Sequence, residues 1–299
     1  MRPYNCCEGR IRKSNSISRN FLPNRRKGRG IVLKLLSDFS KIVFTMKLSQ
    51  VAAQLYTLRD FTKTPDDVAK TLEKVRAIGY EAVQCSALGP IEDARLLQLA
   101  KDNGLTICAT HEGLAPVLNE TDKIIEHLQN LECPHSAIGF PSGVDLGSKE
   151  SVLQFCRDFD AAAKKFADAG LSMGHHNHHQ EFRKIEGKPA LQWILENTQH
   201  ATFELDTYWV QYGGANPESW ARKVAGRAPL IHLKDYGVNA DNSVGYVEIG
   251  NGNLDFPAII AAAEAAGTQW FIVEQDTCPG DPFESLKISF DYIKANLVA

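Results

Sequence analysis

The feature that most limits the fold is an alternation, from Met46 onward, of short apolar runs with longer amphipathic stretches. Eight runs have the length and composition of buried strands: residues 51–56, 82–85, 106–111, 136–140, 171–177, 202–206, 230–234 and 270–274. Eight strand-and-helix units in about 250 residues match the size of one (β/α)₈ barrel. An open doubly wound sheet usually has fewer units and a G-x-G-x-x-G loop, and no such loop follows the first run. The pattern therefore predicts the α/β class and a single (β/α)₈ TIM barrel.

Three of the amphipathic stretches carry helix-end signals. Residues 66–78 follow Thr64-Pro65, a helix start, and are followed by Gly79. Residues 151–169 and 255–266 show apolar residues at helical spacing or an alanine-rich composition, and a glycine follows each of them. Gly250-Asn251-Gly252 is interpreted as a turn.

The charge is divided very unevenly along the chain. Residues 1–45 carry 11 Lys and Arg against two acidic residues, a net charge of +9, whereas residues 46–299 carry 22 against 34, a net charge of −12. We interpret residues 1–45 as a basic N-terminal extension that is disordered or not native, and residues 46–299 as the barrel. An organellar transit peptide is the alternative, whereas a secretory signal is disfavoured because Lys34, Asp38 and Lys41 interrupt the apolar stretch.

Composition also limits the class of protein. An acidic barrel domain argues against a nucleic-acid partner, because such binding depends on a basic face. No apolar run approaches the roughly 18 residues that a membrane span requires. The seven cysteines lack the spacing of a disulfide framework, and Cys85 and Cys108 lie in apolar runs that predict buried thiols. We therefore expect a cytoplasmic enzyme that acts on a small molecule and does not bind a membrane, with a homo-oligomer compatible with the sequence.

Metal-binding residue types occur at the ends of four consecutive predicted strands. In a barrel, the carboxyl ends of the strands carry the functional residues. The last four strands end with His176, Asp206, His232 and Glu274. Histidine and carboxylate ligands without a thiolate suit Mn²⁺, Co²⁺, Zn²⁺, Fe²⁺ or Mg²⁺. The sequence therefore predicts a site for one divalent metal.

The ligand on the fifth strand is left open by the residues alone. Alternation places His176 and His178 on one face and His175 on the other, but it does not choose between the faces. Glu181 competes with the histidines if the chain curls back after the strand.

Other residues at the same end of the predicted barrel are candidates for catalysis or binding. His111 ends the third strand beside a carboxylate, and Lys234 shares a strand face with His232. A divalent metal nearby is expected to lower the pKa of Lys234 and suit it to proton transfer. The candidate catalytic residues are Glu274, Lys234, His111 and His178, and the candidate substrate contacts are Gln54, Tyr56, Gln84 and Trp209.

Several of these segments resemble the sugar phosphate isomerase/epimerase family of the xylose isomerase-like barrels. The resemblance is carried by residues 54–60, 176–178, 205–209, 232–235 and 248–252, and it extends from about residue 47 to 297. It implies one divalent metal held by four strand-end ligands, of which Asp206, His232 and Glu274 match the last three. His176 stands where many members have a glutamate, as in the inosose dehydratase-like branch.

The resemblance implies an isomerase or epimerase that removes a proton α to a metal-bound carbonyl of a sugar. The alternative is a dehydratase or lyase that acts on keto-sugars or 3-keto-glycosides by the same enediolate chemistry. Because no phosphate-binding segment is evident, an unphosphorylated substrate is favoured. A nuclease of the same superfamily and a non-catalytic sugar-binding barrel are the rivals from other classes.

Overall fold

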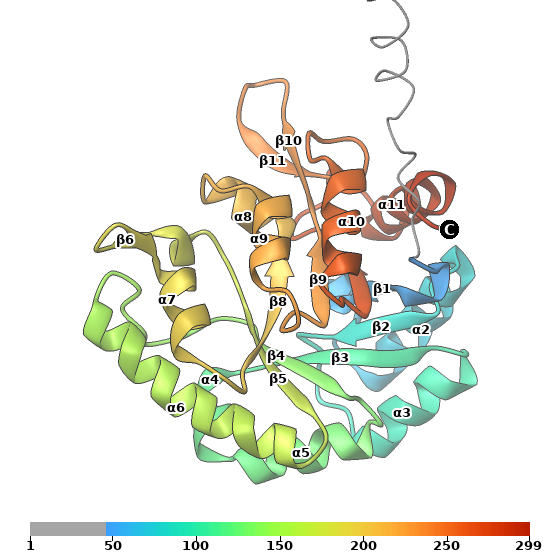
Figure 1. Cartoon of the computed structure of the whole chain (residues 1–299). Helices are drawn as coiled ribbons and strands as arrows, with labels where there is room; N and C mark the ends of the chain where they lie inside the picture. Colours follow the sequence, from blue (N-terminus) through green and yellow to red (C-terminus); the bar gives the residue numbers. More distant parts are fainter. Residues whose placement is uncertain (1–45) are drawn as a thin grey trace, which may run out of the picture. The chain divides into compact units, whose positions relative to one another are not determined.

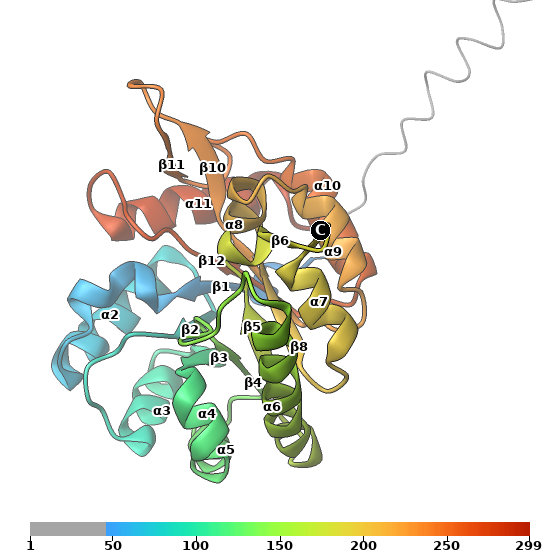
Figure 2. The same ribbon diagram turned by 90° about the vertical axis from the view of Figure 1, so that its left-hand side faces the viewer.

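The computed structural model describes residues 46–299, so the predictions made for residues 1–45 lie outside the described part. Eight parallel strands close into a barrel in the order β1-β12-β9-β8-β5-β4-β3-β2, with helices around them (Figures 1 and 2). The barrel strands are β1 Val51–Gln54, β2 Ala82–Cys85, β3 Thr106–Glu112, β4 His135–Ile138, β5 Ser172–His176, β8 Thr202–Asp206, β9 Leu230–Leu233 and β12 Trp270–Val273. The predicted (β/α)₈ barrel is confirmed, and each predicted strand coincides with one of these.

Three of the α-helices of the described residues correspond to the predicted helical stretches 66–78, 151–169 and 255–266. The α-helices are α2 Pro65–Ile78, α3 Asp93–Asp102, α4 Leu114–Asn119, α5 Thr121–Asn130, α6 Lys149–Asp168, α7 Ala190–Asn197, α8 Thr207–Tyr212, α9 Pro217–Lys223, α10 Phe256–Ala265 and α11 Pro282–Asn296. Three short 3-10 helices are η1 Leu48–Gln50, η2 Leu55–Phe61 and η3 Gln180–Phe182. Thr64 caps α2 in a reciprocal pair with Asp67, and Gly79 ends it at φ 128°. These are the start and stop that the sequence predicts.

Two small hairpins were not predicted. One pairs β6 Lys184–Ile185 with β7 Lys188–Pro189, and the other pairs β10 Asp235–Val238 with β11 Val244–Val247. The second projects beyond the end of the barrel at the top of Figure 1. Asp235 fixes its base, since one carboxylate oxygen accepts hydrogen bonds from the backbone N–H groups of Gly250 and Gly252 at 2.9 and 3.0 Å. A side chain on Gly252 would collide with Asp235, so the predicted glycine turn has a packing reason.

The barrel interior has an apolar layer below a polar one. A small buried cluster consists of Ala52, Ala82, Cys108, Ala109, Leu230 and Ile272. Two residues further along four of these strands stand Gln54, Gln84, His232 and Glu274, which are also buried. Because alternate residues of a strand share a face, both sets point into the barrel. The upper end of the interior is therefore built of polar groups.

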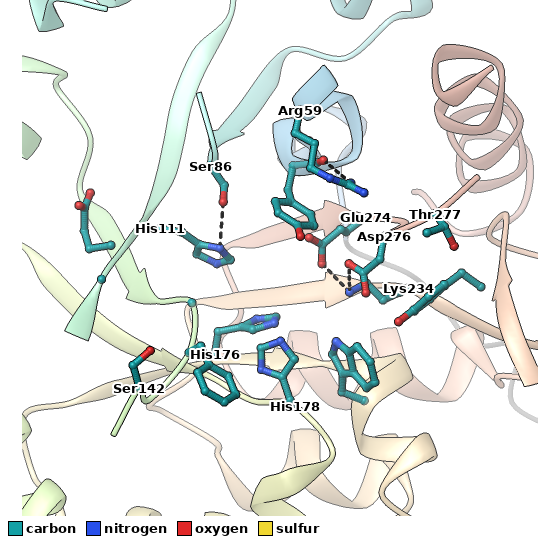
Figure 3. Close-up of a pocket in the computed structure, with 17 residues that line it drawn as sticks. Arg59, Ser86, His111, Ser142, His176, His178, Lys234, Glu274, Asp276 and Thr277 are labelled. Atoms are coloured by element: carbon teal, nitrogen blue, oxygen red, sulfur yellow. Dashed lines mark hydrogen bonds and ion pairs between the residues drawn. The ribbon is translucent and has the colours of Figure 1, made fainter. Parts of the chain in front are cut away.

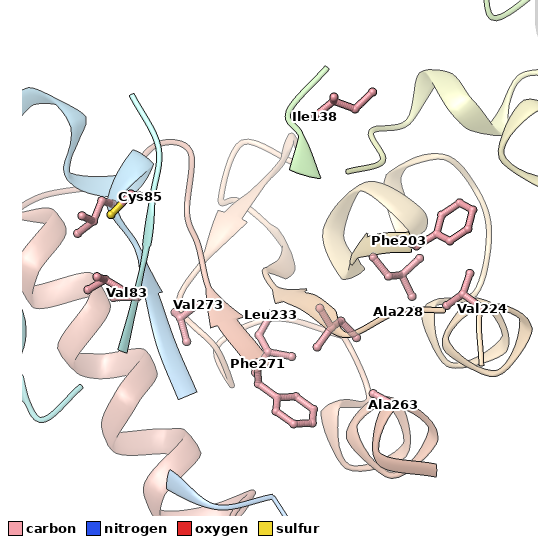
Figure 4. Close-up of a cluster of buried hydrophobic side chains, with 14 of the residues drawn as sticks. Val83, Cys85, Ile138, Phe203, Val224, Ala228, Leu233, Ala263, Phe271 and Val273 are labelled. Atoms are coloured by element: carbon pink, nitrogen blue, oxygen red, sulfur yellow. The ribbon is translucent and has the colours of Figure 1, made fainter. Parts of the chain in front are cut away.

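The main hydrophobic core lies between the strands and the surrounding helices. Figure 4 shows part of it, including Phe203, Leu233, Phe271 and Val273 from the outer faces of strands. Leu233 and Val273 are the chain neighbours of His232 and Glu274. One residue of each strand end thus anchors the strand in the core while the next presents a polar group to the interior.

The cysteines of the described part are free, and Cys85, Cys108, Cys133 and Cys156 are buried. The predicted burial of Cys85 and Cys108 is confirmed. Burial raises the pKa of the Cys133 thiol to about 12, which keeps it protonated near neutral pH. Within residues 46–299, no helix combines the length and apolar character needed to cross a membrane.

Replacing Phe159 with alanine tests the packing of α6 against the barrel. This side chain is fully buried and stacks on Phe155 with ring centroids 5.2 Å apart. We expect Phe159→Ala to lower the free energy of unfolding by about 3 to 5 kcal/mol because it leaves a cavity. Urea denaturation measures the loss, and Ile288→Ala at an exposed site should change it by less than about 0.5 kcal/mol. Equal losses would contradict the assigned core.

Candidate metal centre and pocket

The polar layer of the interior brings together side chains from the last four barrel strands. Strand pairing places His176 opposite Glu204, and Asp206 opposite His232. His176 points inward, whereas His175 lies outside, with its ring 5.7 Å from that of Phe155 on α6. The structure therefore settles the phase of β5, and His176 is the residue of this strand that reaches the centre.

Four of the predicted ligands converge. His176, Asp206, His232 and Glu274 each offer one ligand atom, all four atoms lie within 4.8 Å of one another, and all four residues are buried. Nδ1 of His232 lies 2.9 Å from a Glu274 oxygen and 3.7 Å from Oδ2 of Asp206. Nε2 of His176 lies 3.9 Å from the same Asp206 oxygen. Two imidazole nitrogens and two carboxylate oxygens form a donor set typical of a divalent transition metal.

One carboxylate oxygen of this set lacks a hydrogen bond. Oδ1 of Asp206 accepts from the backbone N–H of Trp209 at 2.9 Å and thereby caps α8. Oδ2 is buried and has no hydrogen-bond partner among the described residues, although it lies 3.2 Å from the Lys234 ammonium. A buried carboxylate oxygen without a hydrogen bond is costly unless a cation binds it. The residues present therefore fit a metal ion at this point.

A further carboxylate, that of Glu204, lies just below the four converging ligands and was not predicted as a site residue. It is fully buried and forms, with His111, His176 and His232, another group with metal-ligand spacing. Its contact with His111 is very short. The signal that identifies it is its position two residues before Asp206, on the same face of the same strand.

The charges of the centre shift the pKa values of its members. Burial opposes ionisation of Glu204, but the neighbouring His232 and His111 outweigh it and hold the pKa of Glu204 well below its usual value. Burial likewise opposes a charge on His232, yet Glu204 and Glu274 outweigh it and raise the pKa of His232 well above the ordinary range. Glu204 is thus ionised, and His232 would release a proton when it binds a metal ion.

Lys234 is held by three carboxylates. Its ammonium lies 3.2 Å from Asp206, 2.7 Å from Glu274 and 3.0 Å from Asp276. Burial favours the neutral amine, but these carboxylates outweigh it and raise the pKa of Lys234 well above its usual value. The lowered pKa predicted for Lys234 beside a bound metal ion is opposed by this carboxylate cage, which the prediction did not include. Asp276, which it did not single out, is the third member of the cage.

A pocket of about 670 Å³ opens above the centre. Figure 3 shows His111, His176, His178, Lys234 and Glu274 around it. The lining also includes the predicted Tyr56 and Trp209, together with Arg59, Glu112, Phe140, Tyr246 and Asp276. Tyr246 comes from the β10–β11 hairpin, which explains why the strand-end rule did not identify it. The pocket thus joins all four predicted catalytic residues to aromatic side chains from four different segments of the chain.

His178 and Trp209 have adjacent rings on the wall of this pocket, with centroids 5.3 Å apart. Burial, assisted by the neighbouring His176, lowers the pKa of His178 to about 3. Its imidazole is therefore neutral near neutral pH. The indole N–H of Trp209 is buried without a hydrogen-bond acceptor in residues 46–299, so it is free to donate to a bound molecule.

Gln54 and Gln84 lie beneath the pocket and do not line it. The Gln54 amide donates to the side-chain oxygen of Gln84 at 2.8 Å, and the Gln84 amide donates to Glu204 at 2.6 Å. Both residues are fully buried. Their position supports the buried carboxylate below the metal centre, whereas Tyr56 and Trp209 are placed to contact a substrate.

Glu181 lies apart from the four converging ligands. After β5 the chain enters the 3-10 helix Gln180–Phe182, which directs the Glu181 carboxylate toward His175 outside the barrel, at 3.3 Å from Nε2. Its other oxygen accepts from the backbone N–H of His178 at 3.0 Å. Glu181 therefore holds the end of β5 from behind rather than from the interior.

Comparison with known proteins identifies the family of this fold. The chain belongs to the xylose isomerase-like TIM barrel family, whose model matches residues 72–295. Among curated proteins no match is found.

Solved structures share the fold at low sequence identity. A sugar phosphate isomerase/epimerase from Parabacteroides distasonis ATCC 8503 is 22% identical, with a TM-score of 0.69 over 87% of this chain and 98% of that chain. An L-ribulose 3-epimerase is 17% identical, with a TM-score of 0.66 over 83% of this chain and 94% of that one. A probable 3-DHS dehydratase from Bacillus anthracis is 13% identical, with a TM-score of 0.63 over 82% and 98%. At these identities the likeness shows the fold alone.

Asp206→Asn tests the metal centre. Asparagine keeps the oxygen that caps α8 but removes the charge and one ligand atom, so the fold should persist while metal affinity falls by more than about 100-fold. Metal analysis after loading with Mn²⁺ or Co²⁺ and dialysis measures the loss. Retention equal to that of the unaltered protein would count against Asp206 as a ligand.

Glu181→Gln separates a ligand from a structural residue. The change leaves the shape of the side chain but weakens its buried contacts with His175 and His178. We expect unfolding to become easier by about 1 to 3 kcal/mol, with metal content unchanged. Denaturation and metal analysis on the same sample give both quantities, and a protein that loses its metal at full stability would identify Glu181 as a ligand.

Proposed function

We propose that this chain is a divalent-metal-dependent enzyme that isomerises or epimerises a sugar by removing a proton from the carbon next to a carbonyl. The observation that carries the proposal is the convergence of His176, Asp206, His232 and Glu274 at the floor of an open pocket. When bound there, a divalent ion acts as a Lewis acid on a carbonyl oxygen and makes the neighbouring C–H acidic.

The chain supplies the groups that move protons and stabilise charge. Glu274 lines the pocket as an ionised carboxylate and is placed to accept the proton. Lys234, cationic and 2.7 Å from it, is placed to stabilise an enediolate oxygen. His111 and His178 also line the pocket and are the candidates for returning a proton to the other face or to an oxygen. Epimerisation requires a second proton-transferring group on the other face, whereas isomerisation can return the proton from the same side.

The substrate that suits this pocket is an unphosphorylated sugar or keto-sugar. Among the described residues, the lining of the pocket contains one arginine, Arg59, and one lysine, Lys234. The ammonium of Lys234 is already paired with three carboxylates. A phosphate would therefore meet more negative than positive charge. Tyr56, Trp209 and Tyr246 offer aromatic faces, which pack well against the C–H face of a sugar ring.

A dehydratase or lyase acting on keto-sugars or 3-keto-glycosides is the second candidate. It is favoured by His176, which stands where many relatives carry a glutamate and which links the chain to the inosose dehydratase-like branch. The structural likeness to a probable dehydratase agrees with this alternative. The first step is the same proton removal, and the outcome differs in whether a β-oxygen leaves.

The remaining assignments follow from charge and chemistry. A net charge of −12 over residues 46–299 opposes a nucleic-acid substrate, and an intact ligand set opposes a non-catalytic sugar-binding barrel. Free buried thiols fit the cytoplasm.

Proton exchange with solvent tests the proposed reaction. The protein loaded with Mn²⁺ or Co²⁺ is incubated in D₂O with ketohexoses and 3-keto-glycosides, and proton NMR follows the position α to the carbonyl. We expect deuterium to enter that position, and the product distinguishes epimer from elimination product. Asp206→Asn serves as the control and should show no exchange above background. A metal-loaded protein that exchanges no proton of any of these substrates would contradict the proposal.

A further inference from the structure

We propose that Glu204 is a positioning residue that orients both metal-binding histidines at once, so that the metal is bound by Nε2 of His176 and Nδ1 of His232. The inference rests on the proposed metal centre. It assigns a function to a buried carboxylate that the reaction itself does not use.

The contacts of Glu204 connect it to every histidine of the centre. Oε2 meets Nε2 of His111 in a short hydrogen bond and lies 3.1 Å from Nδ1 of His176. Oε1 accepts from the Gln84 amide at 2.6 Å and lies 3.2 Å from Nε2 of His232. Each oxygen therefore faces two nitrogens, and one carboxylate occupies the point where three imidazoles meet.

The surroundings of His232 fix its tautomer. Nε2 faces only acceptors, namely Oε1 of Gln84 at 2.7 Å and Oε1 of Glu204 at 3.2 Å. The Gln84 amide is held in this orientation because its oxygen accepts from Gln54 while its nitrogen donates to Glu204. Nε2 must therefore carry a hydrogen. Nδ1 faces the carboxylates of Asp206 and Glu274, so a metal bound between them would replace any hydrogen there and take the lone pair of Nδ1, which fixes the tautomer of the metal-bound ring.

For His176 the two nitrogens are exchanged. Its Nδ1 lies 3.1 Å from Oε2 of Glu204 without meeting hydrogen-bond geometry, and its Nε2 lies 3.9 Å from Oδ2 of Asp206. A histidine ligand commonly donates its second N–H to a carboxylate, which fixes the ring and increases the basicity of the ligand nitrogen. Here a single carboxylate on β8 is placed to do this for two ligands from the strands on either side of it, β5 and β9.

Glu204 itself is not placed to bind the metal. A carboxylate has about four acceptor positions, and four nitrogens face those of Glu204. Oδ2 of Asp206, in contrast, has no hydrogen bond within residues 46–299. The spacing of His111, Glu204, His176 and His232 would also suit a cation. Binding there would cost the contacts that orient both histidines, so we infer one metal per chain.

Cobalt binding tests the inference, with Glu204→Gln compared with Glu181→Gln. Both residues are fully buried glutamates that contact a histidine of β5, but Glu181 contacts the outward one. The unaltered chain should bind one Co²⁺. Glu204→Gln should bind it about 10 to 100 times more weakly, the usual effect of losing such a partner, because the new amide turns N–H donors toward an imidazole N–H. Glu181→Gln should stay within about threefold.

Proton NMR of the cobalt-loaded protein provides a readout that depends on orientation. The ring N–H protons of the two histidine ligands give strongly shifted signals, and those held by buried Glu204 should exchange slowly with solvent. Two such signals are expected in the unaltered chain and fewer in Glu204→Gln. This spectrum of the unaltered protein tests the inference even if the variant does not fold.

The outcomes separate the two proposals. A chain that binds no Co²⁺ overturns the proposed function and the inference with it. A chain that binds one Co²⁺ overturns the inference alone if Glu204→Gln binds with unaltered affinity and keeps both slow signals. Two Co²⁺ per chain, reduced to one in Glu204→Gln, would show that Glu204 is a ligand and not a positioning residue.

Discussion

The two-residue alternation of strands in a closed barrel is the constraint on which the rest of this structure depends. Eight parallel strands in fixed register turn every second side chain inward, so a polar residue near a strand end shares its level with those of the neighbouring strands. Asp206 and His232 meet for this reason. The apolar layer beneath them, which includes Ala52 and Ile272, closes the barrel and isolates the charges from water on that side.

The electrostatics of the centre depend on the apolar layer below it and on the open pocket above it. Asp206, Glu204 and Glu274 remain ionised despite burial because Lys234 and the histidines lie within a few ångströms. The balance uses side chains from strands as far apart as β3 and β9. A centre of this kind is assembled only when the whole barrel has closed, so the binding of a metal there would be linked to folding by mass action.

The sequence predicted the strands and the inward placement of Asp206, His232 and Glu274, because both follow from local periodicity. The phase of β5 could not be predicted, since His175 and His176 are equally polar and only the packing of His175 against Phe155 distinguishes the faces. Glu204 was missed although its place two residues before Asp206 was readable. The role of Glu204 depends on contacts with residues up to 120 positions away in the sequence. No local sequence pattern indicates such contacts.

The hairpin β10–β11 begins immediately after Lys234 and returns through the Gly250 turn, with its base tied by Asp235. The hairpin therefore forms a unit outside the barrel, and its strand β11 contributes Tyr246 to the pocket. Changes in the length or composition of this hairpin would alter the part of the pocket that Tyr246 lines. They would leave the register of the barrel strands unchanged. The fold can acquire a new substrate preference by varying this one insertion while its chemistry is inherited unchanged.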